Sequence, residues 1–209
     1  MMYLANASSP AIRQRMIDGK LGMITTPKEG RSPATAKVWV ADNGCFGKGY
    51  PGDEAYLDWL AKNSKHANRC LFATAPDVVG DAAATLVRSA PFFEPIRAMG
   101  YPVAFVAQDG LTVEATPWDQ FDVLFIGGTT EFKLGAGSRE LTWAAKARGM
   151  LVHMGRVNSR KRIRYASLIG ADSVDGTFLA FGPDVNLPKL TRWMDEVNTQ
   201  TDLMGDASV

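Results

Sequence analysis

The sequence predicts one α/β domain, a single compact (β/α)8 barrel, and three observations lead to this fold class. Short apolar segments alternate with helical patterns along the chain, which is typical of a mostly parallel sheet covered by helices. Eight such segments are present, the number that closes a barrel. The glycine-rich fingerprints of open nucleotide-binding sheets are absent. A doubly wound open sheet is the alternative architecture.

Each apolar segment is expected to form one strand of the sheet. The last segment gives the weakest signal because it is short and half polar. In order along the chain, the expected strands are Met2–Ala7, Leu21–Thr25, Val38–Ala41, Cys70–Ala75, Val103–Ala107, Val123–Ile126, Met150–His153 and Asp172–Val174.

Helices are expected between these strands. They are Pro10–Asp18, Asp53–Asn63, Asp81–Met99, Ser138–Arg148, Ser159–Ile169 and Leu187–Val197. Pro91 and Pro95 are expected to bend or split the third helix, because proline lacks the backbone donor that a helix interior needs. Ser138 is expected to cap the fourth. The segment Leu111–Gln120, with Pro117 inside it, is less regular.

The composition limits the class of protein. Hydrophobic residues make up 46% of the 209 residues, which excludes a disordered chain. Residues 1–200 are interpreted as one barrel domain near the short end for this fold, and residues 201–209 as a polar tail. The net charge of +1 gives no global attraction for nucleic acid, so such a partner needs a local basic patch.

Targeting and metal-binding patterns are missing from the sequence. The first ten residues lack a basic segment followed by an apolar run, and no stretch approaches the roughly 18 apolar residues of a membrane span. A cytoplasmic protein without a membrane partner is therefore expected. The two cysteines, Cys45 and Cys70, form no CxxC pair, so we expect no structural zinc site and no metal.

Polar residues and glycines follow the expected strands. In a parallel barrel, catalytic groups gather at the carboxyl ends of the strands. Asp42, Asp77 and Asp175 follow three different strands, Gln108 follows a fourth, and the Gly127-Gly128 turn follows a fifth. We therefore expect carboxylates and amides to converge on one mouth of the barrel.

Each of these signals also has a purely structural interpretation. Asp42, followed by Asn and Gly, is consistent with an ordinary turn. Asp77 is consistent with a helix cap, and Gly127-Gly128 with a tight turn. His153 is interpreted as a hydrogen-bonded core or rim histidine, because no partner lies at metal-ligand spacing. The joint placement of three aspartates on three strand ends favours a functional site.

In these motifs the chain resembles the tRNA-guanine transglycosylase superfamily, and more closely the DNA-guanine transglycosylases of phages and bacteria, which install 7-deazaguanines in DNA. The family's Asp-Ser-Gly-Gly-aromatic segment corresponds to Asp42 through Phe46. Its Gly-x-Asp-x-Phe-Asp segment corresponds to Gly170 through Asp175. The similarity extends from about Asn6 to Thr177 and covers most of the chain.

The resemblance implies a base exchange through a covalent aspartyl intermediate, catalysed by a pentosyltransferase that needs no cofactor. It assigns the nucleophile to Asp175 and the general acid and base to Asp42. Asp81 remains an alternative to Asp77 for base recognition. The implied base-binding residues are Phe46, Asp77, Gln108, Gly127, Gly128, Met154 and Gly155.

Two departures from the tRNA enzymes favour DNA as the polymer. The sequence lacks their Cys-x-Cys-x-x-Cys…His zinc site, and little chain follows Asp175 to form a zinc-bearing subdomain. The expected substrates are therefore DNA, with its target guanine flipped out or single-stranded, and a free 7-deazaguanine base. A tRNA transglycosylase, a hydrolase of N-glycosidic bonds and a non-catalytic barrel that binds nucleic acid or a base are the alternatives.

A basic cluster follows the seventh expected strand. It is expected to contact backbone phosphates, with a solvated helix face as the alternative. Lys48, Lys133 and Arg139 are expected to extend it. The cluster consists of Arg156, Arg160, Lys161, Arg162 and Arg164.

Overall fold

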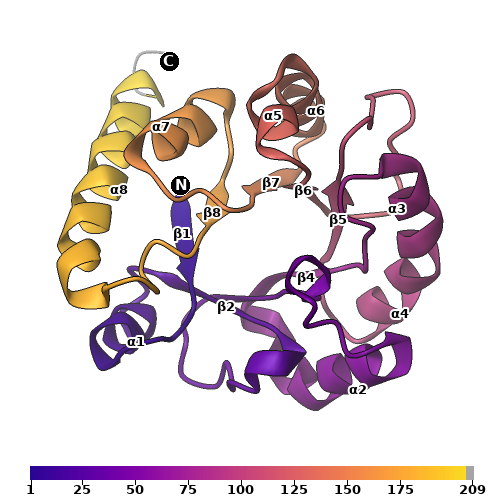
Figure 1. Ribbon diagram of the computed structural model, residues 1–209, viewed down its shortest axis with the longest axis horizontal. Helices are drawn as coiled ribbons and strands as arrows, with labels where there is room; N and C mark the ends of the chain where they lie inside the picture. The colour runs from indigo at the N-terminus through magenta and orange to yellow at the C-terminus, as the bar shows by residue number, and fades with distance from the viewer. Residues whose placement is uncertain (206–209) are drawn as a thin grey trace.

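Eight parallel strands pair in the order of the sequence and close into a barrel, with helices on the outside (Figure 1). The structure is a computed structural model that describes residues 1–205, and side chains for residues 1–199. Closure occurs between β1 and β8, where Tyr3 is in register with Val174. The predicted barrel is confirmed, and the alternative of an open doubly wound sheet is wrong.

All eight expected strands are present, including the weakest. Their bounds are β1 (Met2–Ala5), β2 (Gly22–Thr25), β3 (Trp39–Ala41), β4 (Cys70–Thr74), β5 (Val103–Ala107), β6 (Val123–Ile126), β7 (Leu151–Met154) and β8 (Ser173–Asp175). The eighth strand forms despite its half-polar sequence because it pairs with both β7 and β1.

The helices follow the prediction, including the expected split of the third helix, but one short helix and one cap differ. They are α1 (Pro10–Ile17), α2 (Asp53–Asn63), α3 (Ala82–Ser89), α4 (Phe93–Ala98), α5 (Thr130–Leu134), α6 (Ala136–Ala147), α7 (Arg160–Ile169) and α8 (Pro183–Gly205). Pro91 lies in the 3₁₀ turn that splits the expected third helix into α3 and α4. The short helix α5 was not expected. Ser138 is not a cap, because α6 begins before it and its hydroxyl donates to the Lys133 carbonyl at 2.8 Å.

Helix α8 is longer than expected at both ends. It begins at Pro183 and continues to Gly205, so residues 201–205 of the expected polar tail are helical. Residues 206–209 lie outside the described part of the chain. No helix within residues 1–205 is long and apolar enough to cross a membrane.

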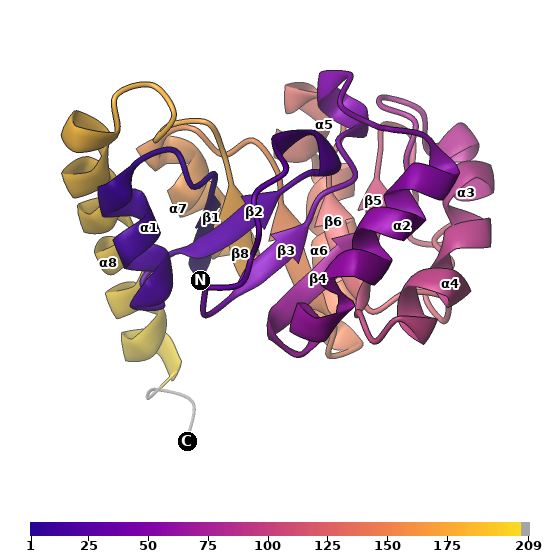
Figure 2. The ribbon, with the colours of Figure 1, turned by 90° about the horizontal axis from the view of Figure 1, so that it is seen from below.

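Two hydrophobic layers surround the strands, because alternate side chains of a strand point to opposite faces. The larger layer lies between the barrel and its helices and includes Trp39, Tyr56 and Tyr101. The smaller layer lies on the opposite face of the strands, inside the barrel. It consists of Leu4, Ile24, Val40, Phe72, Ala104, Val106, Val123 and Phe125. The loops that follow the strands extend from one edge of the barrel (Figure 2).

Candidate active site

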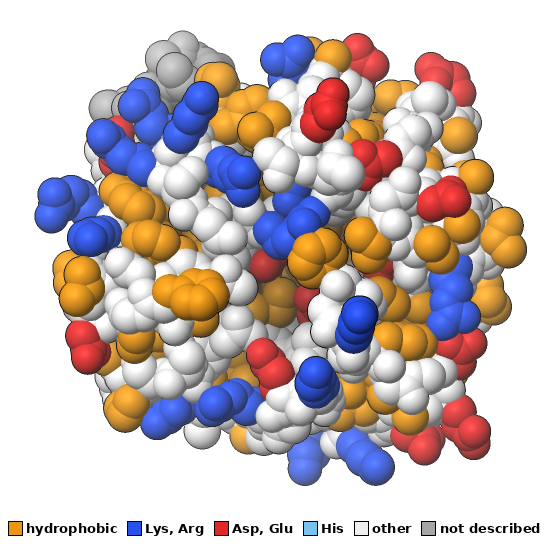
Figure 3. All heavy atoms as spheres, in the orientation of Figure 1, with side chains coloured by type: hydrophobic (Ala, Val, Ile, Leu, Met, Phe, Trp, Pro, Cys, Tyr) orange, Lys and Arg blue, Asp and Glu red, His pale blue; other side chains and the backbone are white. Residues whose placement is uncertain are grey.

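A cavity of about 390 Å³ opens at the carboxyl ends of the strands. Figure 3 shows this face hollowed at its centre, with acidic side chains inside the hollow and Lys and Arg side chains near its rim. Every one of the eight strands or its following loop contributes to the lining. The polar lining comes from Asn6, Thr26, Glu29, Asp42, Asn43, Thr74, Asp77, Gln108, Arg156, Asn158, Asp175 and Thr177.

Asp42 directly follows β3 and lines the cavity. Its Oδ1 accepts a hydrogen bond from the Gly44 backbone N–H at 2.7 Å, so it also forms the turn that the structural interpretation proposed. Burial raises the pKa of Asp42 to about 7, and the neighbouring carboxyls of Asp175, Asp77 and Glu29 add to the rise. A carboxyl with this pKa can both release and accept a proton near neutral pH.

Asp77 follows β4 and is held by two side-chain amides. Its Oδ1 accepts from Asn43 Nδ2 at 2.8 Å, and its Oδ2 accepts from Gln108 Nε2 at 2.6 Å. The side-chain Oε1 of Gln108 in turn accepts a hydrogen bond from the Gly80 backbone N–H at 2.9 Å. Burial raises the pKa of Asp77, while these hydrogen bonds oppose the rise. The Asp77 carboxylate also lines the cavity, where it can accept a hydrogen bond from a ligand.

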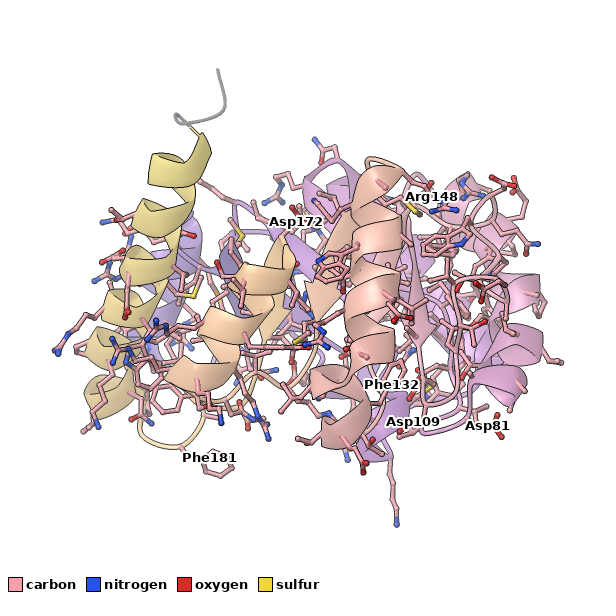
Figure 4. All side chains as sticks on the ribbon, turned by 90° about the horizontal axis from the view of Figure 1, so that it is seen from above. Asp81, Asp109, Phe132, Arg148, Asp172 and Phe181 are labelled. Atoms are coloured by element: carbon pink, nitrogen blue, oxygen red, sulfur yellow. The ribbon has the colours of Figure 1, made fainter. Side chains whose placement is uncertain are left out.

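Asp81 has a different role from Asp77. Its carboxylate accepts a hydrogen bond from the Ala84 N–H at 2.9 Å and caps helix α3. It lies at the edge where the strands end, as Figure 4 shows, but it does not line the cavity. The structure therefore places Asp77, and not Asp81, in the cavity, and the interpretation of Asp77 as a helix cap is wrong.

Asp175 ends β8 on the opposite side of the cavity from Asp77 and is fixed by two donors. The Arg156 backbone N–H donates to its Oδ1 at 3.3 Å, and His153 Nε2 lies 3.0 Å from the same oxygen. An ionised carboxylate only accepts, so Nε2 carries the hydrogen in this pair. His153 Nδ1 lies 2.9 Å from the Ser173 hydroxyl. His153 is fully buried, as its interpretation as a core histidine predicted, and it also orients Asp175.

Phe46 lies at the rim of the cavity with 61% of its surface exposed. The guanidinium of Arg156 lies over its ring, 4.0 Å from the ring centroid, in a cation–π contact. The same guanidinium donates to the Gly128 carbonyl. Phe46 is thus placed to stack on a ligand, but Arg156 covers one face of its ring.

Met154 does not line the cavity, so the expectation that it lies beneath the base is wrong. Side chains alternate along β7: His153 contacts the rings of Phe72 and Phe125, and Met154 is buried in the layer between barrel and helices. Phe125 takes its place in the lining together with the Gly155 backbone. Reading the strand alternation at the expected β7 would have found this difference.

The three expected glycines all line the cavity. Gly128 adopts a φ of +71°, which favours glycine. A Cβ at Gly127 would lie 2.5 Å from the Val106 side chain, and one at Gly155 would lie 2.7 Å from the Phe125 ring. Close packing therefore requires glycine at both positions.

The expected basic cluster is divided between the surface and internal contacts. Arg160 forms an ion pair with Glu196 at 2.9 Å, and Arg162 donates to the Arg156 carbonyl at 3.4 Å. Lys161 and Arg164 are exposed on α7, and Lys48 and Arg139 are exposed elsewhere on the surface. Lys133 is buried, so the expectation that it extends the phosphate-binding patch is wrong.

Within the described residues, no group of three or more His, Cys, Asp or Glu side chains is arranged to hold a metal ion. Cys45 and Cys70 are both free thiols. Burial raises the pKa of Cys45 to about 12, so this thiol beside Asp77 is neutral at physiological pH.

Comparisons with known proteins identify the fold. No family model matches the sequence, and no curated protein matches it. Tryptophan synthase from M. tuberculosis is 13% identical, with a TM-score of 0.56 over 94% of this chain and 90% of that one. 3-Hexulose-6-phosphate synthase from Salmonella typhimurium is 14% identical, with a TM-score of 0.56 over 95% and 98%. Mandelate oxidase is 15% identical, with a TM-score of 0.62 over 98% and 73%. At these identities the likeness concerns the barrel alone.

Proposed function

We propose that this protein is a base-exchanging transglycosylase that replaces guanine in DNA by a free 7-deazaguanine. The observation that carries the proposal is the meeting of Asp42, Asp77 and Asp175 in one cavity, each held by different partners. The exchange needs a nucleophile, a proton donor and a group that reads the guanine edge, and the three carboxyls divide these tasks. The resemblance in sequence motifs assigns the same tasks to the same residues.

The first step breaks the N-glycosidic bond. The Asp175 carboxylate attacks C1′ of the target nucleotide and forms an ester to the sugar, while the electrons of the broken bond go to the departing guanine. Asp42, whose pKa of about 7 leaves it partly protonated at neutral pH, donates a proton to that base. The incoming 7-deazaguanine then loses its proton to Asp42, attacks C1′ and releases Asp175. Two inversions at C1′ give net retention.

Base recognition falls to Asp77 and the lining around it. The free lone pairs of the Asp77 carboxylate suit the N1–H and exocyclic amine of guanine, because a carboxylate only accepts hydrogen bonds. One hydrogen of the Gln108 amide holds Asp77, which leaves the second for the 6-oxo group. Phe46 stacks on the base, a contact worth about 1–3 kcal/mol. Hydrogen bonds and stacking together favour a guanine-like ring over other bases.

DNA is the polymer that we propose. The surface beside the mouth offers Lys161 and Arg164 to a few phosphates, a small footprint that suits a backbone more than a folded RNA. The target base reaches the cavity only when it is flipped out of a duplex or presented in a single strand.

The test offers radiolabelled guanine and 7-deazaguanine to the purified protein with duplex DNA, single-stranded DNA and tRNA in parallel. Label entering DNA but not tRNA supports the proposal. Label entering only tRNA would support the exchange reaction but identify tRNA, and not DNA, as the substrate. Release of guanine without incorporation of a base would identify a hydrolase. Binding of DNA without exchange or hydrolysis would identify a non-catalytic barrel.

A further inference from the structure

Lys133 is a buried cation that the mechanism above does not use. It lies on α5 with 4% of its surface exposed, and its ammonium donates to the Gly155 carbonyl at 2.9 Å. Within the described residues it forms no salt bridge. Fully buried lysines are rare, because removing an ammonium from water is costly unless a partner compensates. The partner here is a peptide group.

The peptide group that accepts from Lys133 also donates to Asp175. The carbonyl of Gly155 and the N–H of Arg156 belong to one planar unit whose two ends point in opposite directions. Lys133 binds the carbonyl end at 2.9 Å, and Asp175 Oδ1 accepts from the N–H end at 3.3 Å. A positive charge on the carbonyl polarises the peptide and strengthens its N–H as a donor.

The backbone around this peptide is built for the close approach. Arg156 adopts a φ of +59°, a left-handed conformation that is unfavourable for a side chain other than glycine. A Cβ on Gly155 would lie 3.3 Å from Asp175 Oδ1 in addition to its clash with Phe125. Non-glycine residues persist in this conformation only when their surroundings hold them, and they cluster at functional sites.

We propose that Lys133 is a positioning residue that acts on the Asp175 carboxylate through the Gly155–Arg156 peptide. The proposal rests on the function above only for the reaction used as a readout. Ionised Lys133 strengthens the hydrogen bond to Asp175 and favours the carboxylate form that attacks C1′. It does so without entering the cavity, so it leaves the space for the base unchanged.

Other charges near Lys133 act in both directions. Burial lowers the pKa of Lys133 to about 8, and the cations Arg156 and Arg162 also lower it. The carboxylates Asp175 and Asp109 oppose them. With this pKa, Lys133 is mostly ionised at pH 7 and loses its charge as the pH rises through about 8, so its effect on Asp175 is present at neutral pH.

The test compares Lys133→Met and Lys133→Gln, which remove the charge, with Lys133→Arg, which keeps it. Lys133→Gln retains an amide donor for the Gly155 carbonyl and separates charge from hydrogen bonding. Lys37→Met is a matched control, since Lys37 donates to the Asp18 carbonyl at 3.4 Å on the exposed surface. Circular dichroism selects the variants that fold.

The first readout requires no catalysis. The protein is labelled with ¹³C at its aspartate carboxyls, and the Asp175 signal is identified by its absence in Asp175→Asn. In Lys133→Gln this signal is expected to titrate at higher pH than in the wild type. In Lys133→Arg, which keeps the charge, it is expected to titrate at the wild-type pH. The same titration in Lys133→Gln, Lys37→Met and wild type would overturn the proposal.

The second readout is the exchange reaction. Lys133→Gln is expected to lower kcat about tenfold, to move the acid limb of the pH–rate profile to higher pH, and to leave KM for the base within about twofold. If the wild type exchanges bases but Lys133→Gln has the same kcat and the same acid limb as the wild type, the role of Lys133 is overturned and the proposed function stands. Wild-type protein without exchange, but with the shifted Asp175 signal in Lys133→Gln, would overturn the proposed function and support the role of Lys133.

Discussion

The two sides of the cavity hold the same kind of side chain in opposite surroundings. On the β3–β4 side, Asp42 and Asp77 are held by a backbone N–H and by neutral amides, and the charged groups that act on Asp42 are other carboxyls. On the β7–β8 side, Asp175 is near His153 and the cations Lys133 and Arg156. When two carboxyls lie in different surroundings, their pKa values can differ, and one can then serve as the proton donor while the other serves as the nucleophile. Under the proposed function, this difference favours Asp42 on one side as the proton donor and Asp175 on the other side as the nucleophile.

Removal of the nucleophile should give the largest effect. Asp175→Asn keeps the shape and loses the attacking charge, so exchange is expected to fall by about 10⁴-fold or more. Single-turnover incorporation of labelled base measures the rate, and affinity for DNA should stay within a few-fold of wild type. When wild-type protein is mixed with DNA and denatured before any free base is added, a covalent adduct between Asp175 and the DNA sugar should be found. Exchange by Asp175→Asn near the wild-type rate would falsify the division of roles.

Asp42→Asn is expected to lower the exchange rate by about 10²- to 10⁴-fold, the usual contribution of general acid–base catalysis. Asparagine keeps the acceptor for Gly44 and cannot titrate. In the wild type, the first step should slow as pH rises above about 7, because Asp42 then loses the proton that it donates. An unchanged rate would mean that Asp42 serves only the turn.

Asp42→Asn is also expected to change the pH dependence of stability. The pKa of Asp42 is about 7 in the folded protein against 3.8 for the unperturbed group, so the folded state takes up a proton as pH falls from about 7 to about 4. Wild-type stability from this group is therefore lost as pH rises toward 7. Asp42→Asn should raise Tm at pH 8, and the gain should shrink at pH 5. Equal destabilisation at both pH values would contradict the cost of burying the Asp42 charge.

Asp77→Asn should affect binding more than chemistry. Both Asp77 oxygens accept from amide hydrogens, so an asparagine amide places a donor against Asn43 or Gln108. Asparagine also offers the base one acceptor fewer, and a guanine N1–H or amine left without its partner costs about 1–3 kcal/mol, which raises KM for the base roughly 5- to 150-fold. Asp81→Asn is the matched control, because Asp81 caps α3 outside the cavity. A larger effect on KM from Asp81→Asn would reverse the assignment.

The smallest effects are expected on the basic surface of α7. Lys161→Ala and Arg164→Ala should each flatten the salt dependence of DNA binding by about one unit of log–log slope where that side chain contacts a phosphate. Arg160→Ala should change the slope less, because Arg160 is already paired with Glu196. Fluorescence anisotropy across a salt series measures these slopes. The reverse order would place the DNA over the end of α8.

The barrel and most of the cavity could be predicted because they depend on local patterns. Apolar segments specify the strands, and residues directly after them must lie at one mouth, as Asp42, Asp77 and Gln108 do. The side chain of Met154 was misplaced because a motif match ignores strand alternation. The burial of Lys133 could not be predicted, since it depends on a short helix that propensity did not indicate. Partners distant in sequence, such as Arg160 and Glu196, are set by packing.

The contact between Arg156 and Phe46 has a kinetic consequence. A purine that stacks on the covered face of the Phe46 ring must first wait for the guanidinium to leave. The measured affinity for the base is then the intrinsic affinity multiplied by the fraction of molecules in which the ring is free, and an open fraction of about one in ten weakens binding about tenfold. At saturating base, the observed association rate should reach a plateau set by opening of the contact. Under the proposed function, a guanidinium that leaves both the ring and the Gly128 carbonyl could bind a phosphate, and uncovering of the ring would then be coupled to arrival of the polymer.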